Sequence, residues 1–524
     1  MSTNTGRASK PPGPPVAGPP VPGPPVALRK PLRPPFDDIV AGLTVSLVLV
    51  PQALAYASLA GLPPAAGLMA AIFPPLASAL LGSSPYLQTG PTALTSLLTL
   101  GVLAASFVPG SPSYVQAAAL LALMVGVSRV VIGLLRFGSL AYFMSLPVLR
   151  GFTSGAAVII VVSQVPAALG RGSQGLGLWR AAWAAISDPA SWNLMAMALC
   201  LVTIVLVRFM RRLTPLVPGV LVAVVLGLVV TQVFGRMVPV IGSLPQSLPL
   251  PSLDLPWRSA GDIALGAVVI ALVGFAEPAA IARTFAKRGQ PWNADRELLA
   301  QGAANMLAGL MRGMPVGGSF ARSALNRQAG ARTRLSGAVA GLAVLAFFPF
   351  VGVLEGLPRA VLAGIVISAA SSLLQLGALV KLWRYAKLQA TTGLATFLLT
   401  LMLTPRIDYA LVLGVSFALF THLYREAQLG VSVERDDGTV TVRFDGVLWF
   451  GSLQSLERAL QRVENNLSGV KRVVLDTGHL GRIDFSALML LHDAEQRLRD
   501  AGLDVEVQGL HGRGEMVMGR IRRG

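Results

Sequence analysis

Apolar runs recur along the chain from Phe36 to about Tyr424, separated by short polar or basic stretches. A helix needs about 20 apolar residues to cross a bilayer. The clearest runs predict membrane-spanning helices at residues 117–135, 151–169, 194–207, 216–233, 263–282, 336–354, 361–374, 391–403 and 409–423. Shorter runs, interrupted by Pro and Gly, lie at residues 39–59, 65–81, 90–107, 298–311 and 317–329. The pattern predicts about fourteen helical segments, some of them too short to span alone.

The pattern changes after about Gly430, in a stretch that holds 14 of the 25 acidic residues. Strands are predicted at residues 439–450, 472–476 and 505–510, alternating with helices at 453–466 and 486–499. Such alternation is typical of a small α/β domain. We expect no helix after the last strand. The chain is thus divided into an N-terminal arm at 1–35, a membrane part at 36–428 and an α/β domain at 429–524.

Composition agrees with a membrane protein. The chain is 53% hydrophobic and 13% charged, about half the charge of a soluble protein. The net charge of +18 comes from Lys and Arg in short clusters between apolar runs, which argues against nucleic-acid binding. Alternation of these clusters along the chain predicts that both termini are cytoplasmic. Prolines fill residues 1–35, and we expect a disordered cytoplasmic arm there.

Few side chains could support catalysis or a cofactor. Cys200 is the single cysteine, and the four histidines lie near or beyond the end of the membrane part. We therefore expect no disulfide, no metal centre and no cofactor. Neither a nucleophile–base pair nor a GxxxxGK[ST] phosphate loop is visible, so an enzyme is not expected.

Two interrupted segments carry the main functional signal. In the first half, Gly90 and Pro91 come directly before Thr92 and Ala93. In the second half, a Pro/Gly stretch comes before Ser319, Phe320, Ala321 and Arg322. Each predicts an extended stretch that turns into a half-helix within the membrane, whose free N–H groups form an anion site. Paired interruptions of this kind are typical of inverted-repeat transporters, although two structurally kinked spans would give the same pattern.

Charged residues inside a membrane are usually functional. Glu277 lies deep in an apolar run and could take up a proton, bind a cation, or act as a structural partner of an Arg or of backbone N–H groups. Arg322 could compensate a bound anion, pair with Glu277, or do both. Gln52 and Tyr56 stand at i, i+4 on one helical face and could line a cavity or pack between helices.

Four motifs together resemble the SulP (sulfate permease) family of anion transporters: PQALAYASLAGLPPAAGL, GSSPYLQTGPTALTSL, DRELLAQGAANMLAGLMRGMPVGGSFARSALNRQAGARTRLSG and LDTGHLGRIDFSAL. The resemblance covers about residues 36–510. It implies an all-α membrane domain with a seven-plus-seven inverted repeat, divided into core and gate, and a C-terminal STAS-like domain. It also implies a homodimer, an elevator-like movement of the core, and a substrate held between two half-helices.

The resemblance also implies which residues form the site. The family's anion pocket falls on Gln52, Tyr56, Thr92, Ala93, Phe320, Ala321 and Arg322, with Ser319 beside them. Glu277 matches the family's acidic position for proton or sodium coupling. Ala321 departs from the family, where Ser is frequent. The loop Asp484-Phe485-Ser486-Ala487 departs from the Asp-Ser-Ser-Gly of phosphorylatable STAS domains, although Ser486 keeps the phosphoacceptor position.

These observations predict a proton-coupled symporter of a small anion such as sulfate, bicarbonate or a dicarboxylate. We place it in the bacterial cytoplasmic membrane, as a homodimer in the lipid bilayer. Sodium could replace the proton as the coupling ion. A nucleobase–cation symporter of the same architecture, an uncoupled anion channel and a membrane-anchored binding protein are the alternatives, and saturable, gradient-driven uptake distinguishes a carrier from the last two.

Overall fold

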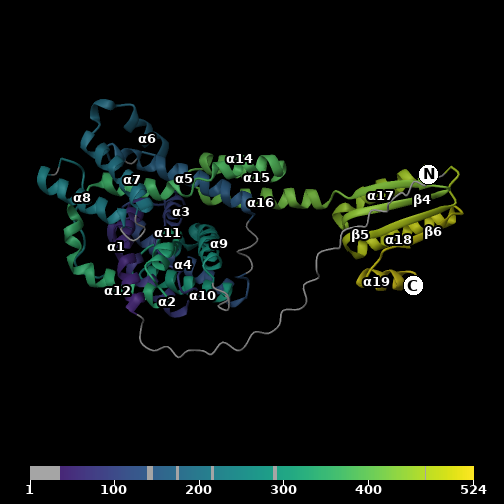
Figure 1. The fold of residues 1–524 in the computed structure, drawn as a ribbon, viewed down its shortest axis with the longest axis horizontal. Coiled ribbons are helices and arrows are strands. Elements are labelled where there is room, and N and C mark those ends of the chain that lie inside the picture. The colour runs from purple at the N-terminus through teal and green to yellow at the C-terminus, as the bar shows by residue number, and fades with distance from the viewer. Residues whose placement is uncertain are drawn as a thin grey trace, which may run out of the picture.

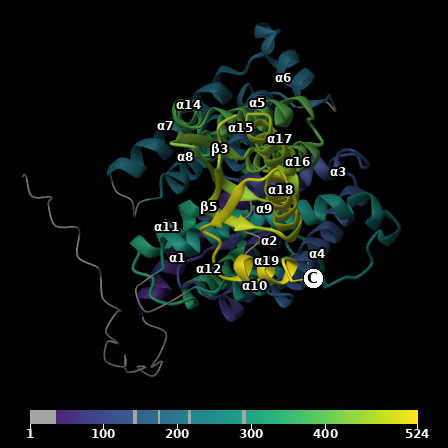
Figure 2. The same ribbon diagram turned by 90° about the vertical axis from the view of Figure 1, so that its right-hand side faces the viewer.

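A computed structural model describes residues 36–138, 145–172, 176–213, 218–235, 237–286, 292–466 and 468–523. The arm predicted at residues 1–35 lies outside them. Helices α1–α15 form one bundle, and a sheet with three helices forms a second body at the far end of α16 (Figure 1). Seen from the side of that second body, β5, α18 and α19 stand in front of the bundle (Figure 2).

The bundle begins with six helices: α1 (Phe36–Leu59), α2 (Pro64–Leu81), α3 (Ala93–Leu103), α4 (Pro112–Leu134), α5 (Leu146–Ala168) and α6 (Leu178–Ile186). Then follow α7 (Leu194–Leu213), α8 (Gly219–Phe234), α9 (Ala260–Thr284), α10 (Ala294–Leu310) and α11 (Phe320–Gln328). The last are α12 (Leu335–Phe347), α13 (Arg359–Ser371), α14 (Leu376–Tyr385), α15 (Lys387–Met402) and α16 (Ile407–Glu426).

Each predicted apolar run corresponds to one of these helices. Eight helical stretches of the described residues are long and apolar enough to cross a membrane, so the count of about fourteen segments remains a prediction. The order α9, α10, α11 repeats the order α1, α2, α3: two long helices, then an extended stretch and a short helix. Two short helices were not expected, α6 and α14. Each exposes bulky apolar side chains such as Trp183 and Trp383 on its surface.

Small residues let the central helices approach closely, as is common in membranes. A Cβ atom added at Gly126 of α4 would lie 2.7 Å from the carbonyl oxygen of Gly302 in α10. One added at Gly309 of α10 would lie 2.6 Å from the carbonyl oxygen of Ala119 in α4. The sequence therefore fixes α10 against α4, and α10 in turn supports the interrupted segments described below.

The C-terminal body is a four-stranded sheet in the order β3 (Gly430–Asp436), β4 (Thr439–Leu448), β5 (Arg472–Ile483), β6 (Asp504–Gln508). β3 is antiparallel to β4, and β4, β5 and β6 are parallel. Helices α17 (Leu453–Glu464) and α18 (Phe485–Asp500) bury the apolar face of β4 and β5. The fold class, a helical membrane domain with a small α/β domain, is confirmed.

Three details of this body differ from the prediction. β3 was not expected as a strand, and β5 continues to Ile483 rather than ending at Asp476. The expectation of no closing helix is wrong, because α19 (Arg513–Ile521) follows β6. It is only nine residues long and buries little besides Met518, too few positions for a readable period. Arg522, directly after it, pairs with buried Glu495 of α18 at 2.9 Å.

Candidate functional site

The two interrupted segments meet in the middle of the bundle. β1 (Thr89–Gly90) pairs antiparallel with β2 (Gly317–Gly318), so Thr89 lies opposite Gly318 and Gly90 opposite Gly317. α3 begins three residues after β1, and α11 begins two residues after β2. The prediction of an extended stretch that turns into a half-helix is confirmed in both segments. Because β1 and β2 are antiparallel neighbours, the two half-helices begin at one place.

Each half-helix is capped by its own hydroxyl residue. The Thr92 hydroxyl accepts a hydrogen bond from the Thr95 N–H at 3.3 Å, and the Ser319 hydroxyl accepts one from the Arg322 N–H at 3.5 Å. The first N–H groups of a helix have no partner within the helix. Those of Ala93 and Ala321 have no acceptor among the described residues. They remain available to an anion, and the helix dipoles favour one there.

A cavity of about 710 Å³ opens at this place. One wall comes from α1, α9, the start of α3 and α11 along its whole length. The opposite wall comes from α5, α7, α8 and the end of α13. All but one of the predicted site residues line it: Gln52, Tyr56, Thr92, Ala93, Glu277, Ser319, Phe320 and Ala321. The structure therefore brings residues from four separate parts of the chain to one cavity.

Arg322 is the exception. Its side chain is buried and lies behind the cavity wall, where Nη1 donates to Gln52 Oε1 at 3.0 Å. Its Nε and Nη2 atoms have no hydrogen-bond partner among the described residues. A Cβ atom added at Gly90 would lie 3.3 Å from Nη2, so the guanidinium uses the space that glycine leaves. Gln52 thus stands between the cavity and a buried positive charge with unused donors.

Glu277 does not pair with Arg322. The described residues contain no ion pair between them within 4.0 Å. Instead, Glu277 Oε1 accepts the Phe320 N–H at 3.3 Å, the first N–H of α11. A carboxylate therefore occupies one of the N–H groups that an external anion would use. Phe320 itself is 39% exposed and packs edge-on against Phe285, which follows α9.

Sequence reasoning missed the residues that hold β1 and β2. Asn305 of α10 accepts the Val316 N–H at 2.9 Å, and its amide donates to the Val316 carbonyl at 3.1 Å. Gln301, one turn earlier, donates to the Thr89 hydroxyl at 2.7 Å. Their i, i+4 spacing in the apolar part of α10, after its charged first turn, was the available signal. Arg150, read only as part of a basic cluster, also lines the cavity.

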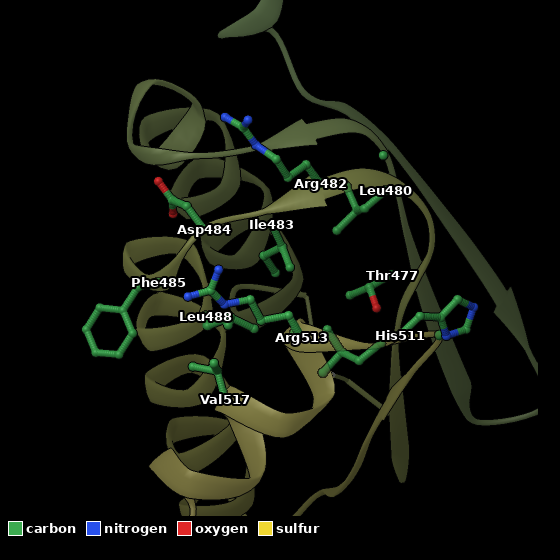
Figure 3. A pocket seen from close by; sticks show the side chains of 14 residues that line it. Thr477, Leu480, Arg482, Ile483, Asp484, Phe485, Leu488, His511, Arg513 and Val517 are labelled. Carbon is green, nitrogen blue, oxygen red and sulfur yellow. The ribbon is translucent and has the colours of Figure 1, made fainter.

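A second cavity, of about 590 Å³, lies in the C-terminal domain where β5 leads into α18 (Figure 3). Arg482, His511 and Arg513 are among its lining residues. The Asp484 carboxylate caps α18 through the Ala487 N–H at 2.9 Å and also accepts the Phe450 N–H at 2.8 Å. Ser486, in the first turn of α18, is exposed. The position that the resemblance matches to a phosphoacceptor is thus open to solvent, although its neighbours Phe485 and Ala487 do not match the phosphorylatable loop.

Comparison with known proteins agrees with this arrangement. Residues 36–396 match the sulfate permease family, and residues 430–521 match the STAS domain. A probable sulfate transporter of Mycobacterium tuberculosis is 33% identical over 494 residues, which cover 89% of this chain and 88% of that one.

Two solved structures share the architecture. The murine anion transporter Slc26a9 in its inward-facing state superposes with a TM-score of 0.85 at 19% identity, covering 93% of this chain and 87% of that one. The transmembrane domain of the cyanobacterial bicarbonate transporter BicA gives a TM-score of 0.64 at 25% identity, covering 71% and 97%. From its family match and its relatives, this chain belongs to the sulfate permease family and is a membrane-embedded anion transporter with a C-terminal STAS domain, not an enzyme.

Proposed function

We propose that this protein is a proton-coupled secondary transporter of a small anion, with sulfate as the first candidate, in the bacterial cytoplasmic membrane. The observation that carries the proposal is the meeting of two half-helix starts at a cavity backed by Arg322 and faced by Glu277. Sulfate is favoured because the mycobacterial relative is a probable sulfate transporter. Bicarbonate and dicarboxylates fit the same chemistry and belong in the same assay.

The coupling step follows from the contact of Glu277. An ionised carboxylate on the Phe320 N–H competes with an external anion for the start of α11. Protonation of Glu277 removes its negative charge and weakens its hold on this N–H, so anion and proton bind together. In this mechanism Glu277 binds the coupling proton, while Thr92, Ala93, Ser319, Phe320 and Ala321 supply the helix starts. Gln52 and Tyr56 close the cavity on the α1 side.

The walls of the cavity support an elevator-like movement. The helices that carry the site, α1, α3, α9 and α11, pack with α2, α4, α10 and α12. On the opposite wall, α5 packs with α13 and α15, and α13 packs with α7. A site at the boundary between two packed groups can change its exposure when one group slides along the other. We propose that the first group is the mobile core and that both termini face the cytoplasm.

Uptake into proteoliposomes tests the function. With an inward proton gradient, we expect the wild type to accumulate one labelled anion of a sulfate, bicarbonate, chloride and succinate panel, with saturation. Glu277→Gln should lose the dependence on the gradient, since the amide cannot exchange a proton. Asp262→Asn is the matched control, because Asp262 is an exposed carboxylate on the same helix. Unsaturable flux that ignores the gradient in all three proteins would indicate a channel.

Gly90→Ala tests the placement of Arg322 without changing any charge. Gly90 has φ of +156°, and an added Cβ would press on Arg322 Nη2. We expect about a tenfold rise in KM for the transported anion, because the guanidinium that holds Gln52 must shift by a few tenths of an ångström, as must Leu49. The control is Gly110→Ala, where φ is +81° but nothing lies within 4 Å. If both variants raised KM by the same factor, backbone strain rather than displacement of the guanidinium would be the cause.

A further inference from the structure

A second arginine is buried in the bundle, and the proposed mechanism does not use it. Arg129 of α4 has no exposed surface. Its guanidinium donates three hydrogen bonds to backbone carbonyls: Nε to Ala271 at 3.1 Å, Nη1 to Val316 at 3.0 Å and Nη2 to Ile270 at 3.3 Å. No carboxylate of the described residues forms an ion pair with it. A buried arginine without an acid is costly in a membrane, so a role is expected.

The three acceptors belong to the segments that carry the site. Ile270 and Ala271 lie on α9, two turns before Glu277. Val316 directly precedes β2, and β2 leads into α11. Gly274, one turn before Glu277, leaves room for the guanidinium, since an added Cβ would lie 2.5 Å from Nη2. Arg129 therefore ties the helix of Glu277 to the strand that leads into the second half-helix.

The charges around the site do not balance. Arg129 and Arg322 are buried and positive, and Glu277 is the one acidic residue among the described residues that line the cavity. The other ionisable side chains facing the cavity are Tyr56 of α1 and Arg150 of α5. With a proton on Glu277, the two buried arginines carry two uncompensated positive charges. Arg150 adds a third charge at the cavity, but it is only half-buried and is therefore better screened by water. A dianion neutralises both buried charges, whereas a monoanion leaves one in a region of low dielectric.

We propose that Arg129 is a positioning residue of the anion site whose buried charge makes the loaded site favour a dianion over a monoanion. The inference rests on the proposed function and adds to it the residue that sets the charge of the substrate. Carbonyl hydrogen bonds hold the guanidinium behind the meeting point of β2 and α9, where it acts on the anion through space. The helix starts line the cavity, and Arg322 lies directly behind its wall at Gln52.

The test compares a dianion with a monoanion in the full-length protein in proteoliposomes. KM is measured for labelled sulfate, and the inhibition constant for chloride. Coulomb energy is proportional to the charge of the anion, so a tenfold loss for sulfate corresponds to about a threefold loss for chloride. We expect this pattern for Arg129→Gln. Arg129→Lys keeps the charge and should return KM for sulfate to within about threefold of wild type. The control is Arg384→Gln, which removes an exposed positive charge on α14. Arg384 does not line the cavity, so its loss should change neither constant.

If Arg129 only stabilised the fold, the variants would change the kinetic constants in a different way. Both anions would then lose the same factor, or only kcat would fall, and lysine would not restore KM; either result overturns the proposal. If Arg129→Gln does not assemble, Gly274→Ala takes its place, because the added methyl group pushes the Arg129 guanidinium aside without removing its charge. This variant should also raise KM for sulfate by a larger factor than it raises the inhibition constant for chloride. An unchanged ratio in Gly274→Ala overturns the proposal too. Wild-type protein without saturable anion uptake would instead refute the proposed function itself.

Discussion

Arg322→Gln is expected to lower kcat/KM for anion uptake by about a hundredfold or more, which corresponds to about 3 kcal/mol. The arginine is buried, and its Nη1 holds Gln52 Oε1 at 3.0 Å. Removing it takes away the buried cation that backs the two half-helix starts and leaves Glu277 without that positive charge behind the wall. The remaining amide cannot compensate an anion. Initial rates of uptake over a range of anion concentrations in proteoliposomes measure the effect.

The matched control is Arg332→Gln. Arg332 is 69% exposed and forms a surface ion pair with Asp37, a kind of contact worth little. Its loss should change uptake less than twofold. A thermal unfolding midpoint in detergent, measured for both variants, separates loss of transport from loss of fold. Normal uptake by Arg322→Gln would show that the helix starts alone bind the anion, and the mechanism drawn above would be wrong.

The helices could be predicted from the sequence because each contains a long apolar run, and such a run is a local property of the chain. The half-helices could be predicted for the same reason, since Gly90-Pro91 and the Pro/Gly stretch before Ser319 stop a helix wherever they stand. The short surface helices α6 and α14 were missed because their apolar faces are too short to give a period. β3 was missed because it is an edge strand with hardly any buried side chain.

The assembly of the site was beyond sequence reasoning. The bond from Arg322 to Gln52 joins residues 270 positions apart, and the pairing of Thr89 with Gly318 is also long-range. Nothing local distinguishes a guanidinium that lines a cavity from one that lies behind its wall. The resemblance to a family named the right segments, yet only the structure shows that Glu277 contacts the Phe320 N–H rather than Arg322.

Gly67→Ala is expected to destabilise the fold by about 3 kcal/mol, a large effect for one methyl group. A Cβ atom at Gly67 of α2 would lie 2.1 Å from the carbonyl oxygen of Ala53 in α1. Backbone cannot move aside as a side chain can, so the two helices must separate. Ala53 is next to Gln52, and the same shift should pull Gln52 away from Arg322. We therefore expect a thermal midpoint several degrees lower and a higher KM together.

Gly261→Ala is the control with the opposite expected sign. Gly261 lies near the start of α9, and nothing surrounds the position of its added Cβ within 4 Å. Alanine favours a helix over glycine by up to about 1 kcal/mol, so this variant should be as stable as the wild type or more so. If Gly67→Ala matched it in midpoint and in KM, α1 and α2 would not be in backbone contact. The position of Gln52, and with it the hold on Arg322, would then depend on side chains alone.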